Sequence, residues 1–134
     1  MLYSIHTGYV DSYDGGQKDI IYLVSSVERV AQGKRQWCFT DGHAVEAMTD
    51  FFDNAADLNR VDWAVINHWS WKNTEEDPDR KRRKQAEFLI HQSFPWSWVE
   101  GIGVINNAMQ QQVSSVLAQT QHQPTVMIQP KWYY

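Results

Sequence analysis

Short runs of apolar and β-forming residues recur along the chain and predict a series of strands. Glycine, proline or polar turn residues bound these runs, as is typical of strands in a small domain. The predicted strands are residues 20–24, 36–40, 86–91, 102–105 and 125–128, and residues 2–6 form a further short extended piece.

Apolar residues three and four positions apart predict helices between these strands. The clearest is an amphipathic helix that ends at Asp53 and has one apolar face, formed by Ala44, Ala47, Met48, Phe51 and Phe52. Shorter or more polar helices are predicted at residues 27–32, 57–66, 97–100 and 107–120. Strands and helices mix without a regular βαβ order, which favours an α+β fold over a doubly wound sheet.

Length and charge limit the classes of protein to consider. The 134 residues are the length of one domain and no linker divides them, so a single domain over residues 1–134 is predicted. The formal net charge is -4, which argues against binding of nucleic acid by overall charge. Any such contact needs a local basic patch, and the run Arg80–Lys84 supplies one.

Cysteine and histidine give no sign of a metal site. The single cysteine, Cys38, excludes an internal disulfide and a cysteine-based zinc site, and the five histidines lack metal-ligand spacing. No apolar run approaches the roughly 20 residues that a membrane-spanning helix needs. No basic segment followed by an apolar stretch opens the chain. We therefore expect a cytoplasmic protein that binds neither a metal nor a membrane.

Glu87 is the strongest candidate for chemistry. In the predicted strand 86–91, alternation places Glu87 on the same face as Leu89 and His91. A carboxylate on a largely apolar strand costs free energy unless it has a partner or a function. It could stabilise an oxocarbenium-like transition state and accept a proton in a glycosyl transfer. The alternative is a strand-edge glutamate paired with Arg82 or Arg83.

Two readings stay open for the segment that precedes this strand. The basic run could bind the phosphates of a nucleic acid, or it could form an ordinary solvated loop face. Residues 68–79 are polar and read as an exposed loop that contains Trp69 and Trp71. These two tryptophans could pack in the protein or stack on an unpaired base.

Residues 80–91 (RKRRKQAEFLIH), followed by Ser93–Trp96 (SFPW), resemble the DarT family of DNA ADP-ribosyltransferase toxins. Further blocks agree with the family in the same order along the chain. They are Met1–Tyr3, Gly15–Gln17, Phe39–Asp41, Asp50–Asp53 with Leu58 and Val61–Trp63, Ile102–Val104, and Pro130–Tyr134. The resemblance covers essentially the whole chain, which would correspond to the C-terminal two-thirds of a family member.

The resemblance implies an α+β fold with a split central β-sheet and flanking helices, as in other ADP-ribosyltransferases. It implies transfer of ADP-ribose from NAD to a base, typically thymine, in single-stranded DNA, and a macrodomain antitoxin that removes the mark. The family's catalytic glutamate matches Glu87. The loop that presents the DNA acceptor matches residues 68–85, so the candidate DNA contacts are Arg80, Arg82, Arg83, Lys84 and, at the start of the predicted helix, His43.

One feature of the family has no counterpart in this chain. Family members carry a segment before the Met1–Tyr3 block, with an NAD-binding histidine and an arginine just ahead of that block. We therefore expect a truncated ADP-ribosyltransferase domain, and the residues that bind NAD are left unassigned. The alternative function is an inactive module that binds nucleic acid or another protein. An exposed sheet edge would also allow a homodimer.

Overall fold

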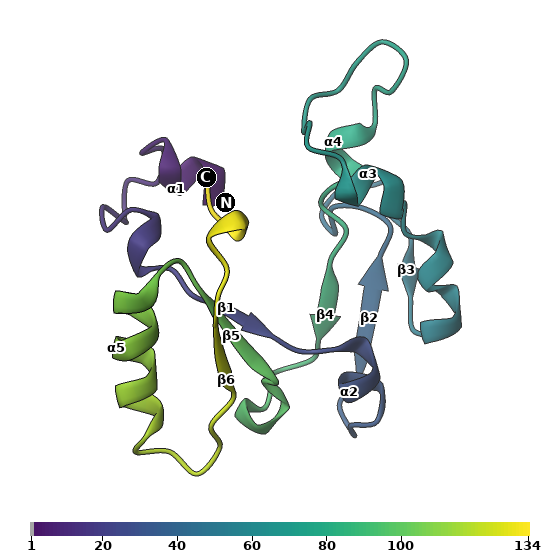
Figure 1. The fold of residues 1–134 in the computed structure, drawn as a ribbon. Coiled ribbons are helices and arrows are strands. Elements are labelled where there is room, and N and C mark those ends of the chain that lie inside the picture. Colours follow the sequence, from purple (N-terminus) through teal and green to yellow (C-terminus); the bar gives the residue numbers. More distant parts are fainter. Residues whose placement is uncertain (1) are drawn as a thin grey trace. The chain divides into compact units, whose positions relative to one another are not determined.

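The computed structural model describes residues 2–134, so Met1 of the resemblance block lies outside the described residues. The chain divides into two compact units (Figure 1). Unit 1 comprises residues 2–26 and 95–134, and unit 2 comprises residues 27–94. Because each unit is described by itself, the single domain over residues 1–134 stays a prediction.

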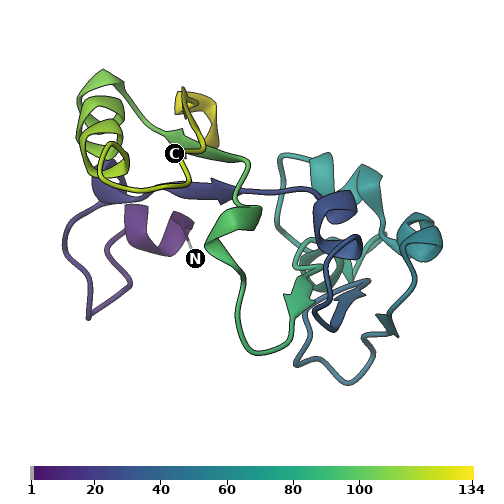
Figure 2. The same cartoon turned by 90° about the horizontal axis from the view of Figure 1, so that it is seen from below.

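Unit 1 is built on a three-stranded sheet in the order β1-β5-β6. Its strands are β1 (Tyr22–Val24), β5 (Gly101–Val104) and β6 (Thr125–Ile128). Strand β5 is antiparallel to β1 and parallel to β6. The parallel pair requires a crossover, which α5 (Asn107–Leu117) provides. Figure 2 shows α5 beside the strands of this sheet.

The core of unit 1 lies between α5 and the sheet. It consists of Val99, Ile102, Val104 and Leu117, with Met109, Val113 and Val126 packed against it. Asn106 caps the helix by accepting a hydrogen bond from the N–H of Met109 at 2.9 Å. The predicted strand 102–105 and helix 107–120 are thereby confirmed to within a few residues. Met109, Val113 and Leu117 of the helix face the core, whereas Val116 is 64% exposed.

Unit 1 also contains α1 (Leu2–His6) and three 3-10 turns, η1 (Gln17–Asp19), η3 (Trp96–Trp98) and η4 (Pro130–Trp132). The extended piece predicted at residues 2–6 is therefore wrong. Gly8, at φ 74°, ends the helix, with the N–H of Tyr9 bonded to the Ser4 carbonyl at 2.8 Å. That left-handed glycine just after a short helix is a common stop signal.

The C-terminal turn packs onto the sheet of unit 1 at Gly103. A Cβ atom at this position would overlap the ring of Trp132. Tyr22 meets the same ring edge-on at 5.4 Å, and its hydroxyl donates to the Trp132 carbonyl at 2.7 Å. Gln17 holds the end of the chain with both amide atoms, bonding the N–H and the carbonyl of Tyr134.

Unit 2 contains the second three-stranded sheet, in the order β3-β2-β4, and both pairings are antiparallel (Figure 1). Its strands are β2 (Trp37–Thr40), β3 (Phe51–Phe52) and β4 (Phe88–Ile90). Its helices are α2 (Val27–Ala31), η2 (Ala55–Arg60), α3 (Trp63–Asn67) and α4 (Arg80–Arg83). Two three-stranded sheets with flanking helices confirm the predicted α+β, split-sheet fold.

An aromatic layer covers one face of this second sheet. Phe39 stacks on Phe52 at 5.1 Å and on Phe88 at 6.5 Å, and Phe88 stacks on Trp37 at 5.1 Å. The pairing of Phe39 with Phe88 and of Cys38 with Leu89 places alternate residues on opposite faces. The position before Phe88, Glu87, therefore belongs to the face opposite the aromatic layer.

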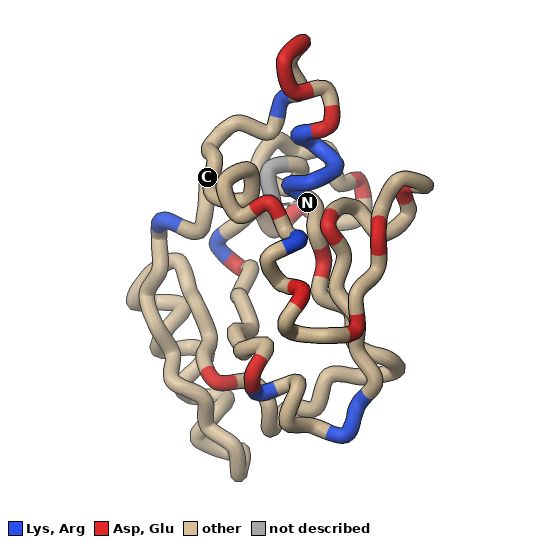
Figure 3. Tube along the Cα trace, turned by 90° about the vertical axis from the view of Figure 1, so that its right-hand side faces the viewer, with Lys and Arg blue, Asp and Glu red and all other residues tan. Residues whose placement is uncertain are grey.

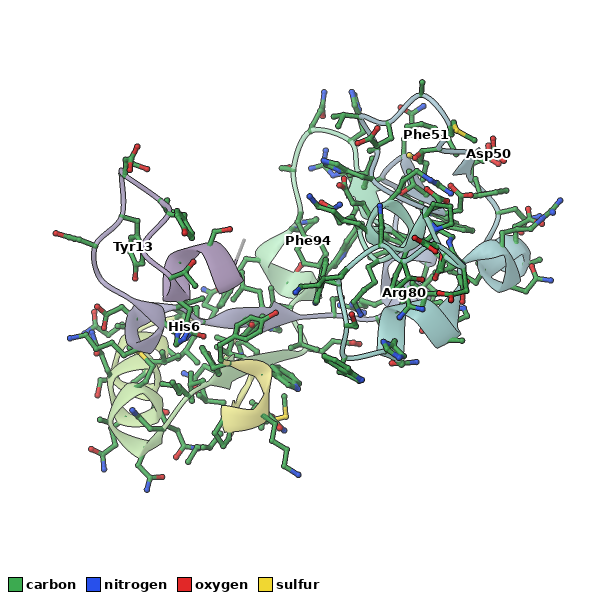
Figure 4. The ribbon with its side chains drawn as sticks, turned by 90° about the horizontal axis from the view of Figure 1, so that it is seen from above. His6, Tyr13, Asp50, Phe51, Arg80 and Phe94 are labelled. Carbon is green, nitrogen blue, oxygen red and sulfur yellow. The ribbon has the colours of Figure 1, made fainter. Side chains whose placement is uncertain are left out.

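The amphipathic helix predicted through Asp53 is wrong. Residues 43–50 form a series of turns, and Phe51 and Phe52 form β3. Phe52 pairs with Phe39 in the sheet, so the apolar spacing reflects strand packing and not a helix face. Val45 and Met48, at about 80% exposure, form no core. Figure 4 labels Asp50 and Phe51, where the turns end.

Candidate active site

Glu87 is held at the start of β4 by the end of β2. The N–H of Thr40 donates to the Glu87 carbonyl and the N–H of Glu87 donates to the Thr40 hydroxyl oxygen, each at 2.9 Å. Thr40 is fully buried, and its own hydroxyl donates to the Gly42 carbonyl at 2.6 Å. One buried threonine thus fixes both the backbone of Glu87 and the beginning of the turn that follows β2.

The Glu87 carboxylate meets the imidazole of His43. Nδ1 of His43 lies 2.8 Å from Oε1 of Glu87, and each side chain is 34% exposed. With the carboxylate as the acceptor, this hydrogen bond places a proton on Nδ1 of the ring. The pair is ordered by the protein and still reachable from solvent, as a group that acts on an external substrate must be.

The turn that carries His43 is tied to α4 through Arg82. The Arg82 guanidinium donates to Asp79 through Nε and Nη2, at 2.9 and 2.7 Å. Through Nη1 it donates to Asp41 at 3.0 Å and to the Thr49 hydroxyl at 3.2 Å. The hydrogen bonds to Asp79 and Asp41 raise the pKa of Arg82, and those from Arg82 lower the pKa of Asp79.

The rest of the basic run is also bound internally. The residues form the short helix α4 and not the loop that was expected. Arg80 donates to Asp77 at 2.9 Å, and Arg83 bonds Asp77 and Asp62. Figure 3 shows the basic segment with acidic residues next to it, and Figure 4 labels Arg80. The alternative in which Arg82 or Arg83 pairs with Glu87 is not what the structure shows, because both bind aspartates.

Lys84 is the most buried member of the run. Its ammonium group donates to the carbonyls of Val65, Ile66 and His68, at the C-terminal end of α3, where unpaired carbonyls lie. The same group lies 4.9 Å from the ring centre of Trp71. Burial, and secondly the charge of Arg80, lower the pKa of Lys84.

The loop between α3 and α4 contains the two tryptophans singled out from the sequence. Trp71 lies against the Lys84 ammonium group, and it is still 47% exposed. Trp69 is 87% exposed, and its ring lies 5.7 Å from the ring of His68 at 25°. Trp69 is therefore the more exposed of the two tryptophans.

A shallow open hollow of about 500 Å³ lies between the turn and α4. Its lining is mostly polar and mixed in charge, since Glu46 and Asp79 contribute carboxylates beside His43, Asn73, Lys81, Arg82 and Gln85, and Ala47 and Met48 are apolar. Such a lining suits a polar ligand better than an apolar one. Among residues 2–134 there is no group of three or more His, Cys, Asp or Glu side chains placed to hold a metal ion.

Sequence reasoning missed the aspartates that organise this site. Asp77 and Asp79 stand three residues before Arg80 and Arg82, a spacing that brings side chains together on one helical turn. That signal was present in the sequence. Asp41 and Asp62 are distant along the chain and gave no comparable signal. No helix among the described residues is long and apolar enough to span a bilayer.

Comparison with protein families gives one match over the whole chain. A family model described as "ssDNA thymidine ADP-ribosyltransferase, DarT" matches residues 1–134. A DNA ADP-ribosyl transferase of Thermus aquaticus is 43% identical over 136 residues, which cover 100% of this chain and 58% of that protein. The chain therefore spans less than two-thirds of that relative, in keeping with the share predicted from the resemblance.

Solved structures of a second relative have the same fold. Thermus sp. 2.9 DarT in complex with ADP-ribosylated ssDNA matches with a TM-score of 0.91 and 35% identity, over 99% of this chain and 63% of that one. The same protein in complex with NAD+ matches with a TM-score of 0.90 and 35% identity, over 99% and 66% of the two chains.

Proposed function

The chain belongs to the DarT family of single-stranded DNA thymidine ADP-ribosyltransferases, and on that basis we propose that it transfers ADP-ribose from NAD to thymine in single-stranded DNA. NAD is the proposed co-substrate, and Glu87 is the proposed catalytic residue. The observation that carries the proposal is the part-buried hydrogen bond between His43 and Glu87, 2.8 Å long, which orders a carboxylate next to a histidine that lines an open polar hollow.

The proposed reaction uses the carboxylate in two ways. The bond between the ribose carbon and the nicotinamide nitrogen breaks, and its electron pair stays on nicotinamide. A nearby carboxylate stabilises the positive charge that develops on the ribose. A nitrogen of the base then bonds to the same carbon and loses its proton to Glu87. In thymine joined to DNA, N3 is the nitrogen that carries a proton, which makes it the proposed acceptor atom.

We propose that His43 supports this step and contacts the DNA. Its Nδ1 proton is donated to Glu87, and this hydrogen bond orients the carboxylate. Nε2 is then the ring nitrogen that is left for a hydrogen bond to the DNA strand. This combines the role in DNA binding predicted for His43 with a role next to the catalytic carboxylate.

The proposed DNA-binding surface is the basic run. Lys81 is exposed at the hollow, and Arg80, Arg82, Arg83 and Lys84 stay candidates for phosphate contacts. The internal hydrogen bonds of Arg80, Arg82, Arg83 and Lys84 limit this role, because each side chain would have to leave a carboxylate or carbonyl in order to bind a phosphate. The cost of exchange is largest for Lys84, whose ammonium group bonds three carbonyls.

Further proposals concern partners and location. A macrodomain antitoxin that removes ADP-ribose is proposed on the basis of family membership alone. Strands β3 and β4 are edge strands of their sheet within unit 2, and an edge strand can pair with a second copy, so a homodimer is also proposed. NAD and DNA as substrates support a cytoplasmic location. Light scattering that gives the mass of a monomer would contradict the dimer.

The test is an assay with labelled NAD and single-stranded oligonucleotides, some without thymine. It is run on the 134-residue chain and on any longer polypeptide that the gene encodes. We expect labelled DNA only with thymine, and a loss of about 100- to 10,000-fold for Glu87→Gln, the range for a general acid or base. Glu75→Gln, on the exposed loop, is the matched control. Labelled DNA that persists in Glu87→Gln rejects the catalytic role. Salt-dependent DNA binding without NAD turnover in every form supports the inactive module.

A further inference from the structure

We infer that Arg82 is a positioning residue, which holds the turn after β2 so that the His43 imidazole reaches Glu87. This inference rests on the proposed function, and it gives Arg82 a role other than contact with DNA phosphates. The guanidinium makes hydrogen bonds to three side chains, those of Asp41, Thr49 and Asp79, and it is only 14% exposed.

The backbone of His43 is fixed from both sides through Arg82. The N–H of His43 donates to the Arg82 carbonyl at 3.0 Å. The carbonyl of His43 accepts a hydrogen bond from the Thr49 hydroxyl at 2.8 Å, and the same hydroxyl oxygen accepts from Nη1 of Arg82. The backbone of residue 82 thus holds the N–H of His43. The Arg82 side chain reaches the His43 carbonyl through Thr49, and that carbonyl also accepts from the N–H of Glu46 at 3.0 Å.

The residue before His43 shows how closely Arg82 approaches the turn. A Cβ atom at Gly42 would overlap the Arg82 side chain, so the guanidinium lies against the bare backbone of this glycine. Asp41, one residue earlier, accepts from Arg82 and also from the N–H of Asp50, at 3.0 Å each. Arg82 thereby joins the two ends of the turn, at residues 41 and 49–50.

An arginine is needed because of the geometry and not only the charge. Its planar fork donates in several fixed directions, whereas lysine presents a compact ammonium that cannot reach three separate acceptors in one plane. A contact with a DNA phosphate needs chiefly a positive charge, which lysine also provides. Arg82→Lys therefore separates the two roles for this residue.

A second variant tests the same connection without a change of charge. Thr49→Val keeps the shape of the buried side chain and removes the hydroxyl that links Arg82 to the His43 carbonyl. A phosphate contact by Arg82 would not need this hydroxyl. If Arg82→Lys is too unstable to purify, Thr49→Val still decides the question.

The first measurement requires neither NAD nor transfer activity. Proton-detected ¹⁵N NMR of the imidazole, at one fixed pH, reports whether Nδ1 of His43 carries the proton that it donates to Glu87. We expect this signature in the wild type and in Arg60→Lys, an exposed arginine used as the matched control. We expect its loss in Arg82→Lys and in Thr49→Val. Retention of the signature in both variants would overturn the inference, whatever the outcome for the proposed function.

The second measurement compares kcat for ADP-ribose transfer with the Kd for single-stranded DNA in the same variants. A misplaced His43 lowers kcat for transfer about 10- to 100-fold, because small errors in the position of reacting groups are costly. The Kd for single-stranded DNA is expected to change less than kcat in Arg82→Lys, since the charge is kept and only the His43 contact is displaced. An unchanged kcat in Arg82→Lys would overturn the inference, because the lysine keeps only the positive charge that a phosphate contact needs. If no form of the protein transfers ADP-ribose, the NMR result alone decides.

Discussion

His43 and Glu87 are 44 residues apart in the sequence, and Nδ1 of the first lies 2.8 Å from Oε1 of the second. Thr40 connects them, since it bonds the backbone of Glu87 and, through its hydroxyl, the Gly42 carbonyl next to His43. The strand pairing of β2 with β4 therefore fixes the carboxylate and the start of the imidazole's turn together. The strand register brings the two residues close together, and the hydrogen bond between their side chains then forms.

We expect His43→Ala to lower the transfer rate about 10- to 100-fold, because a hydrogen bond to a charged group contributes roughly 1.5–3 kcal/mol. His43→Asn should lose less, since its side-chain amide can still donate to Glu87. Initial rates with NAD and a thymine oligonucleotide measure the difference. His91→Ala, an exposed histidine just after β4, is the control. Equal losses in the alanine and asparagine variants would contradict a role for the Nδ1 hydrogen bond.

The strands that form this site were predictable, and the turn between them was not. Residues 36–40 and 86–91 are rich in β-forming side chains, and they form β2 and β4 in nearly the predicted bounds. Their alternation correctly separated Glu87 from Phe88. Glu87 itself could be identified because a carboxylate is unusual on such a strand. The sequence alone could not say that its partner is His43.

The apolar spacing of residues 44–52 predicted a helix wrongly, because the same spacing also fits a series of turns followed by a strand. Phe51 and Phe52 form β3, where Phe52 packs on Phe39. The polar groups of His43 and Thr49 bond Arg82 from far along the chain, in place of the bonds of a helix. Tertiary contacts of this kind override local periodicity, and they cannot be read from a single sequence.

Acid is expected to destabilise unit 2 through Asp79. Hydrogen bonds from Arg82 lower the pKa of Asp79 below its ordinary value of 3.8. The stabilisation is therefore fully present above pH 3.8, and it is lost as the pH falls through the lower native pKa. Urea unfolding between about pH 5 and pH 2.5 measures this loss. Asp79→Asn should reduce the pH dependence, whereas Asp53→Asn, an exposed control, should not. An unchanged dependence in Asp79→Asn would contradict the assignment.

Lys84→Met is expected to destabilise the protein although methionine is the more apolar residue. It removes the donor from three carbonyls at the end of α3, and unpaired carbonyls cost about 1–3 kcal/mol. Methionine also removes the free-energy cost of burying a charged ammonium group, the burial that lowers the pKa of Lys84, and this offsets part of the loss. Urea unfolding measures the free energy, and cleavage by a protease within residues 68–79 reports release of the loop. Lys72→Met, on the exposed loop, should change neither result. Equal or greater stability of Lys84→Met would show that the carbonyls find other donors.

Trp69 is expected to bind DNA by stacking and not by charge. Its ring is 87% exposed, and stacking of a base on an aromatic side chain contributes about 1–3 kcal/mol. Trp69→Ala should therefore weaken binding of a single-stranded oligonucleotide about 5- to 150-fold, and Trp69→Phe should retain most of the affinity. Because no charge is removed, the slope of affinity against salt concentration should stay the same.

Fluorescence anisotropy with a labelled oligonucleotide at several salt concentrations measures both quantities for Trp69. Tyr9→Ala provides the control, since Tyr9 is 80% exposed but belongs to unit 1. Wild-type affinity in Trp69→Ala would exclude a stacking contact. Equal weakening in Tyr9→Ala would show that exposed aromatic residues contribute without regard to position. Only a loss confined to Trp69, with an unchanged salt dependence, places an unpaired base on the loop that precedes α4.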